Sequence, residues 1–367
     1  MKRILFFADA SSVHTQRWVR EIAARGFECV VATRRPAAVP GARDVIPLRP
    51  GSDAAGWLLA LPEVQRVARS VAPHWVHGHY VTSYGLWAAA SGLGPQVPVV
   101  LTAWGSDILV TPRARGWRGS AMAALVRWTL RRAALVSADA QDVLAEIRRY
   151  GPTARCEEVV WGADTERFAP GRPAAGFEIA SLRAWEPNYN LDTVLRAFAR
   201  LRAARPQAAA VLHLLGGGPD EAALRALAAE LELPEDAVRF AGRVGDDEML
   251  GTLQRSRASI SVPTSDATSV SMLEAMACGL PVVASELPAN REWLDAASGL
   301  LVPPRDASAL AAALLRLVDE PAFARAQGRR NREVAVQRAS RAAEMERMAV
   351  LYDALRLQAP RPAGEAA

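Results

Sequence analysis

The chain has 367 residues, half of them apolar, and a formal net charge of +5. This length allows two domains, each with its own hydrophobic core, and no apolar run reaches the roughly 18 residues of a membrane-spanning helix. Three scattered cysteines and five histidines without metal-ligand spacing argue against a disulfide scaffold or a structural zinc site, and they fit the reducing cytoplasm. The basic residues form no array interleaved with aromatics, which argues against nucleic-acid binding.

Apolar stretches of strand length recur through the first half of the chain, separated by segments of helix length. They read ILFFAD, ECVVAT, DVIPL, WVHGHY, VPVVLTA, AALVSAD and EEVVWG. Strands that are apolar throughout, rather than at alternate positions, are typical of parallel sheets covered on both faces. The start, MKRILFFADASS, is basic and then apolar but has no A-x-A cleavage pattern, so we expect a buried first strand and not a signal peptide.

The same alternation resumes after a proline- and glycine-rich break at residues 169–177. Five further strands are predicted, from EIASL, VLHLLG, VRFAG, ASISVP and VVASE. The pattern predicts two doubly wound, Rossmann-like α/β domains of residues 1–170 and 171–335. Ligands of such sheets bind at the carboxyl ends of the strands, so facing domains would place the chemistry in a cleft between them. From Pro321 to Leu357 we expect one long helix, and residues 358–367 are predicted to be a disordered tail.

The segment from 259 to 285 carries the most specific signal. It predicts a strand, a polar loop with Asp266, a short helix that contains Glu274, and a second strand. The start of a helix offers unpaired N–H groups and a positive dipole end, which suit a phosphate. The two carboxylates flank that start and are placed to accept hydrogen bonds from hydroxyls on either side of the phosphate, as in a nucleotide-sugar. A structural alternative is a capping box between Ser271 and Glu274.

The whole segment closely resembles the nucleotide-sugar segment of glycosyltransferase family 4, the retaining enzymes of GT-B fold. Glu274 opens the string EAMACGLPVVA, which matches that family almost letter for letter, whereas the first acidic position is usually Glu and is Asp266 here. The resemblance implies that Glu274 holds the ribose and that Asp266 meets the hexose hydroxyls. It also implies that the backbone N–H groups of Thr268, Ser269 and Val270 contact the phosphate and the sugar. A helix of residues 336–357 is further implied to cross back to the first domain.

Three further places in the second domain resemble the family's donor site. Arg183 matches an arginine that clamps the diphosphate, a task suited to a guanidinium fork, and the lysine of the family's Lys-Gly pair is assigned to Asn190, next to Tyr189. With a neutral residue there, either Asn190 and Tyr189 supply neutral donors or another arginine reaches in. The turn GGGP places Gly217 against the donor, and Arg243 and Val244 are predicted neighbours of the base.

The acceptor side is expected in loops of the first domain. Ser12 stands where relatives often carry a glycine, and His14 and Arg17 open the next helix, although a histidine there is also often structural. In HGHY, His77 is expected to face inward, and the two residues expected nearer the cleft are His79 and Tyr80.

The string TAWGSDIL is expected to line the acceptor pocket. Relatives often read T-x-H-G in this place, so Trp104 replaces a histidine at the reaction centre. Trp104 either stacks on a sugar face or fills the core. Asp107 follows in GSD and is a candidate catalytic group beside Arg183 and Asp266.

These features predict a cytoplasmic, metal-independent, retaining glycosyltransferase without cofactor. It would move a hexose from a nucleotide diphosphate sugar to a saccharide or lipid-linked glycan in polysaccharide biosynthesis. No strong nucleophile is apparent, which favours front-face displacement through an oxocarbenium-like transition state, with Arg183 and helix N–H groups stabilising the leaving phosphate. No D-x-D motif is placed to hold a metal. Two alternatives remain, a nucleotide-sugar epimerase and an inactive relative that binds nucleotide-sugar or a partner enzyme.

The segment from Trp117 to Arg132 is basic and rich in tryptophan. It predicts either a peripheral contact with the inner face of the membrane or a solvated helix face that packs on the sheet.

Overall fold

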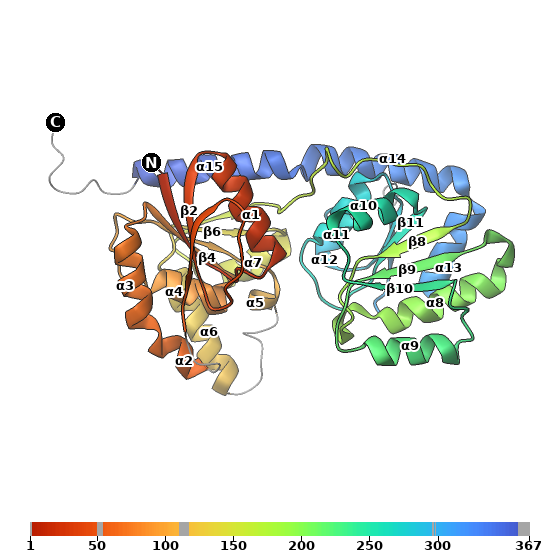
Figure 1. The fold of residues 1–367 in the computed structure, drawn as a ribbon, viewed down its shortest axis with the longest axis horizontal. Helices are drawn as coiled ribbons and strands as arrows, with labels where there is room; N and C mark the ends of the chain where they lie inside the picture. Colours follow the sequence, from red (N-terminus) through yellow and green to blue (C-terminus); the bar gives the residue numbers. More distant parts are fainter. Residues whose placement is uncertain (1, 50–53, 110–116, 296, 298, 359–367) are drawn as a thin grey trace. The chain divides into compact units, whose positions relative to one another are not determined.

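The computed structural model describes residues 2–49, 54–109, 117–295, 297 and 299–358 (Figure 1). The chain forms two compact units. One contains the residues up to Val160 together with the segment from Ala342 onward, and the other runs from Trp161 to Arg341. The first change of unit therefore falls about ten residues before the boundary at residue 170 that the proline-rich break suggested.

The first unit is built on a seven-stranded parallel sheet with helices on both sides (Figure 1). The strand order is β3-β2-β1-β4-β5-β6-β7. Every apolar run predicted in this half contains or overlaps a strand, and the middle strands are almost fully buried, as expected for a covered parallel sheet. The strands are β1 (Lys2–Phe7), β2 (Phe27–Thr33), β3 (Ala42–Pro47), β4 (Trp75–His79), β5 (Val99–Thr102), β6 (Leu135–Ala138) and β7 (Arg155–Glu158). The helices are α1 (Val13–Ala24), α2 (Ala54–Leu59), α3 (Leu61–Val71), the π-helical turn η1 (Tyr80–Tyr84), α4 (Gly85–Ala89), α5 (Ser106–Leu109), α6 (Trp117–Leu130) and α7 (Gln141–Arg149).

The second unit has a six-stranded parallel sheet of order β10-β9-β8-β11-β12-β13. All five predicted strands are present, and the structure adds a short sixth at the edge, whose three residues are too few for a sequence signal. The strands are β8 (Glu178–Ser181), β9 (Val211–Leu215), β10 (Val238–Gly242), β11 (Ala258–Ser261), β12 (Val282–Ser285) and β13 (Leu300–Val302). The helices are η3 (Pro187–Tyr189), α8 (Leu191–Ala204), η4 (Pro206–Ala208), α9 (Glu221–Glu230), α10 (Asp246–Arg255), α11 (Val270–Ala277), α12 (Pro288–Arg291), α13 (Ala307–Asp319) and α14 (Pro321–Arg338).

The single long helix predicted from Pro321 to Leu357 is wrong, because the structure has two helices, α14 and α15 (Arg341–Gln358). The break occurs where Ala163 pairs with Ser340: the Ala163 N–H donates to the Ala339 carbonyl at 2.8 Å, and the Arg341 N–H donates to the Ala163 carbonyl at 2.9 Å. These hydrogen bonds to a distant segment replace the bonds that would continue the helix. Local helix propensity gives no indication of them.

Helix α15 belongs to the first unit. Its buried Tyr352 accepts a hydrogen bond at its carbonyl from the Trp75 indole at 2.7 Å, and its hydroxyl lies 2.6 Å from Nδ1 of His77. Gln358, the first residue of the predicted tail, ends this helix, and residues 359–367 lie outside the described part of the chain. No helix in the described ranges combines the length and the apolar character that crossing a bilayer requires.

Candidate active site

Arg183 lies at the centre of the polar cluster at the carboxyl ends of β8 and β11. Its Nη1 donates to Ser269 Oγ at 2.5 Å and to Ser271 Oγ at 3.4 Å, and its Nη2 donates to Asp266 Oδ2 at 2.6 Å. The side chain is only 9% exposed. The structure thus brings together three residues that the sequence proposed for donor binding, from segments more than 80 positions apart.

Tyr189 covers one face of this guanidinium. The carbon at the centre of the Arg183 guanidinium lies 4.3 Å from the centroid of the Tyr189 ring, within range of a cation–π interaction. Within the described residues the Nε of Arg183 has no hydrogen-bond acceptor, although it is buried. The arginine is therefore held through Nη1, through Nη2 and on one face, whereas its Nε has no acceptor among the described residues.

Asn190 lies beside this cluster, but its amide is used inside the domain. It donates to the Val262 carbonyl at 2.8 Å and to Thr264 Oγ1 at 3.0 Å, and its oxygen accepts from Nε of Arg305 at 3.1 Å. Its φ of +51° is the left-handed conformation that favours glycine. The backbone therefore favours aligning Asn190 with the glycine of the family's Lys-Gly pair, and Tyr189 with the lysine.

Helix α11 begins two residues earlier than the capping-box alternative requires. Ser269 is its N-cap and accepts a hydrogen bond from the Met272 N–H at 3.4 Å, so Ser271 lies inside the first turn and does not cap the helix. Glu274 is 3% exposed, and its carboxylate lies 3.7 Å from Nη2 of Arg341. The capping box between Ser271 and Glu274 is therefore wrong.

The other residues predicted around this helix take different positions. The hydroxyl of Thr268 accepts a hydrogen bond from the Trp293 indole at 3.1 Å, so one of its acceptor positions is used inside the domain. Val270 is half-buried at the helix start.

The GGGP turn after β9 packs directly beneath Arg183. A Cβ at Gly216 would lie 2.2 Å from the Arg183 carbonyl, and one at Gly218 would lie 2.2 Å from the Trp185 carbonyl. Gly217 instead faces the side chain of Arg243, whose nearest atom would be 3.4 Å from a Cβ. The turn therefore needs glycine at Gly216 and Gly218, because it packs against the backbone of Arg183 and Trp185. Gly217 lies next to Arg243, and the following residue, Val244, is half-buried.

Two loops of the first unit are joined by Asp107. Its carboxylate is 2% exposed and accepts hydrogen bonds from the N–H of Val81 at 2.6 Å and of Trp104 at 3.0 Å. Burial raises the pKa of this carboxyl to about 6, against the lowering effect of the backbone hydrogen bonds. The geometry gives Asp107 the role of anchoring the loops after β4 and β5, where Tyr80 has a strained φ of +64°.

The predicted acceptor residues gather around Trp104 at the carboxyl ends of β1, β4 and β5. The centroid of its ring system lies 5.2 Å from that of His14, 5.5 Å from that of His79 and 6.0 Å from that of Tyr80. Trp104 is half-buried, as are Ser12 and Arg17 nearby. Aromatic side chains therefore line this edge, and Trp104 packs against neighbouring rings in tilted and edge-on arrangements and is not enclosed in the core.

The two histidines of HGHY are buried. His77 lies between the Tyr352 hydroxyl and Thr102 Oγ1, at 2.6 and 2.8 Å, which confirms that it faces inward. His79 has its Nδ1 3.4 Å from Thr15 Oγ1, and its Nε2 has no partner in the described ranges. Burial lowers the pKa of His79 to about 3, so this ring is neutral near pH 7.

Sequence reasoning missed Asn188. The Asn188 amide donates to the Ser265 carbonyl at 2.9 Å, and its oxygen accepts from the Ser265 N–H at 3.2 Å, which ties the loop after β8 to the loop after β11. Asparagine is favoured where loops form such bonds between a side chain and the backbone. The asparagines of the string PNYN could therefore have indicated this contact.

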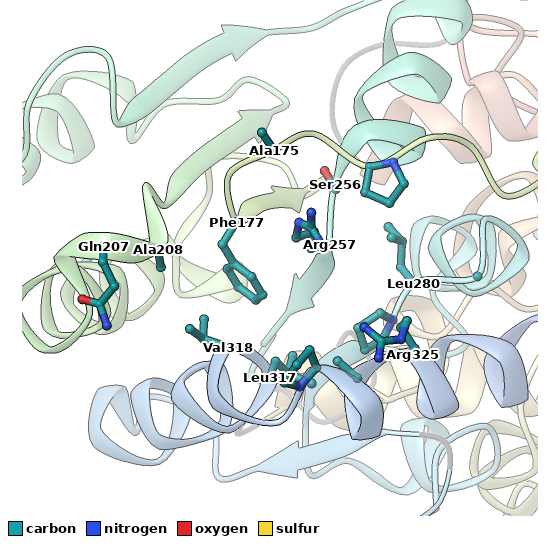
Figure 2. A pocket seen from close by; sticks show the side chains of 15 residues that line it. Ala175, Phe177, Gln207, Ala208, Ser256, Arg257, Leu280, Leu317, Val318 and Arg325 are labelled. Atoms are coloured by element: carbon teal, nitrogen blue, oxygen red, sulfur yellow. The ribbon is translucent and has the colours of Figure 1, made fainter.

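The cavity of Figure 2, about 320 Å³ in volume, lies away from this cluster. It is lined by residues that precede β8, β11 and β12, at the amino ends of the strands, including Phe177, Arg257 and Pro281. A second cavity of about 460 Å³ lies between α8 and α9 and includes Asn190 and Arg305. The described residues contain no cluster of His, Cys, Asp or Glu that could hold a metal ion.

Comparison with known proteins relates both units to one kind of enzyme. The family described as "Glycosyl transferase 4-like" matches residues 3–140, and the family described as "Glycosyl transferases group 1" matches residues 178–320. A sucrose-phosphate synthase from Thermosynechococcus elongatus has the same fold, with a TM-score of 0.82 over 98% of this chain and 100% of that one, at 20% identity.

Two curated proteins are similar in sequence. A GDP-mannose-dependent monoacylated alpha-(1-6)-phosphatidylinositol monomannoside mannosyltransferase of Corynebacterium glutamicum is 29% identical over 217 residues, which are 51% of this chain and 55% of that protein. A glycogen synthase of Mycobacterium tuberculosis is 26% identical over 361 residues, covering 87% of this chain and 85% of that one. Since the two family matches cover most of both units and the relatives are glycosyltransferases, the resemblance of the 259–285 segment is confirmed: the chain belongs to the glycosyltransferases of family 4, with GT-B type fold.

Proposed function

We propose that this glycosyltransferase moves a hexose from a nucleoside diphosphate sugar to a hydroxyl of a saccharide or lipid-linked glycan, with retention at the anomeric carbon and without a metal ion. The arrangement of Arg183 at the N-terminus of α11, beside Asp266, carries this proposal. It supplies a cation and backbone N–H groups where a diphosphate leaves, and a carboxylate for sugar hydroxyls.

In the proposed reaction the acceptor oxygen forms a bond to the anomeric carbon as the bond from that carbon to the phosphate oxygen breaks. The acceptor's proton passes to the departing phosphate, on the same face of the sugar. Charge grows on this phosphate, and preorganised donors stabilise it most effectively in a buried site. Asp266 is ion-paired with Arg183, so we assign it to hexose hydroxyls and not to nucleophilic attack.

Donor and acceptor classes follow the relatives. The Corynebacterium enzyme is named for GDP-mannose and a phosphatidylinositol mannoside, which supports a hexose donor and a lipid-linked acceptor here. Neither curated relative nor the sucrose-phosphate synthase is named as an epimerase or a binding protein.

A thermal-shift screen tests the donor assignment. We expect one of UDP, GDP and ADP, and its hexose conjugate, to raise the melting temperature in EDTA, because a ligand that binds only the folded state stabilises it by about 2.7 kcal/mol at 100 times its Kd. Product anomers are then assigned by NMR. Absence of any shift with all three nucleotides and their conjugates, or an inverted anomer, would contradict the proposal.

We further propose that α6 contacts an anionic membrane surface. Trp117 is 76% exposed, and Arg127 and Trp128 are exposed further along the helix, which contains no acidic residue; the exposed Arg131 follows its last residue. The Arg132 guanidinium lies 4.1 Å from the Trp128 ring. Exposed tryptophan together with arginine is typical of helices that lie at a membrane interface.

Vesicle sedimentation tests this contact. Arg131→Glu should weaken binding to vesicles that contain phosphatidylglycerol by at least about fivefold, since each basic residue near such a surface contributes about 1 kcal/mol. Arg66→Glu on α3, at another exposed arginine, makes the same charge change elsewhere. Equal binding of both variants, or wild-type binding that phosphatidylglycerol does not increase, would overturn the membrane proposal.

A further inference from the structure

We propose that Tyr189 is a positioning residue for the donor diphosphate: its ring fixes the plane of the Arg183 guanidinium and so compensates for the family's second cation. This inference rests on the proposed function. It starts from the backbone of Asn190, whose positive φ favours Tyr189 at the lysine position.

The surroundings of Arg183 show what the ring contributes. Nη1 is held by Ser269 and Ser271, Nη2 by Asp266, and one face by the ring of Tyr189 at 4.3 Å. Nε and Nη2 form one edge of the guanidinium fork, and only Nη2 has an acceptor among the described residues. This edge matches two phosphate oxygens.

Donor binding would exchange one anion for another at this edge. Phosphate oxygens would take Nε and Nη2, which releases Asp266 to accept hydrogen bonds from the hexose hydroxyls. During the exchange Arg183 loses the ion pair that held it, and the contacts that persist are the Tyr189 ring and the serine hydroxyls. A fixed guanidinium avoids the loss of side-chain freedom that binding otherwise costs.

The polar neighbours Asn190 and Arg305 do not provide an equivalent second cation. The amide of Asn190 is occupied by Val262 and Thr264, and Arg305 donates its Nε to the oxygen of Asn190 and so is directed at the amide. A lysine at position 189 would add a second positive charge. A tyrosine adds none and instead holds the Arg183 guanidinium in position.

Three variants test the role of the ring. Tyr189→Phe keeps the aromatic face and should bind the nucleoside diphosphate like the wild type. Tyr189→Leu removes it and should raise the Kd by about 2- to 30-fold, the range that a cation–π interaction of about 0.5–2 kcal/mol gives. Phe323→Leu, which removes a cation–π contact with Arg316 elsewhere in the same unit, should leave the Kd unchanged.

The measurement is calorimetric titration with whichever of UDP, GDP and ADP stabilises the wild type most. In an Arg183→Ala background, Tyr189→Leu should have no further effect, because the ring acts through that arginine; a purely structural role would lower affinity in both backgrounds. Wild-type affinity in Tyr189→Leu, an equal loss in Tyr189→Phe, or additive losses in the double variant would overturn this inference. Failure of the wild type to bind any of the three nucleotides would instead contradict the proposed function.

Discussion

Arg183→Ala is expected to lower kcat/KM for the donor by about 100- to 1,000-fold, as loss of one preorganised donor to a developing oxyanion does in other enzymes. The effect should be large because Arg183 is buried and is the side chain that joins Asp266 to the start of α11. Arg183→Lys keeps the charge but not the fork, so its activity should fall between the wild type and the alanine variant. Initial rates at varied donor concentration measure the effect.

Arg200 offers a matched control. It lies on α8 in the same unit, exposed, and bonds to Ser308 on the surface. Arg200→Ala should keep wild-type activity. Asp266→Ala should also lose transfer, since Asp266 is assigned to the hexose. If Arg183→Ala and Asp266→Ala both retain activity while folded, as judged by circular dichroism, the donor site lies elsewhere.

Asp107→Asn is expected to remove a pH dependence of stability. Burial raises the folded-state pKa of Asp107 to about 6, above its ordinary value of 3.8, so the folded state holds this proton more tightly than the unfolded state. Stability therefore falls as the pH rises through the interval between these values. Relative to the asparagine variant, the wild type should lose about 2 kcal/mol of unfolding free energy between pH 4.5 and 7.5.

Urea unfolding at the two pH values measures this difference. Asp44→Asn, an exposed change in β3, should leave the wild-type pH dependence as it is. The buried histidines, whose pKa values are lowered by burial, act in the opposite direction in both proteins, so subtraction of the variant isolates Asp107. If the unfolding free energies of the wild type and of Asp107→Asn change equally with pH, burial does not raise the pKa of this carboxyl.

The donor side of the predicted site could be inferred from the sequence more fully than the acceptor side. The donor loop was readable because one contiguous string contains Asp266, Ser269 and Glu274, and helix α11 begins where the serines indicate. The residues around Trp104 come from three separate segments, so their contacts depend on the neighbouring order of β1, β4 and β5 in the sheet. Asp107 has the residue type of a catalytic group, but its partners are two backbone N–H groups that only the folded chain supplies.

By itself the sequence determined the α/β class, twelve of the thirteen strands found in the described residues, and the segment that carries Asp266 and Glu274, because continuous apolar runs and a helix-start motif are local properties. Only the tertiary structure decided that Asn190 faces inward with a positive φ, that Tyr189 covers Arg183, and that the last long helix is interrupted at Ser340. Each of these depends on hydrogen bonds or ring contacts between residues that are not neighbours in the sequence, or on a backbone angle, and neither propensity nor periodicity encodes such a partner.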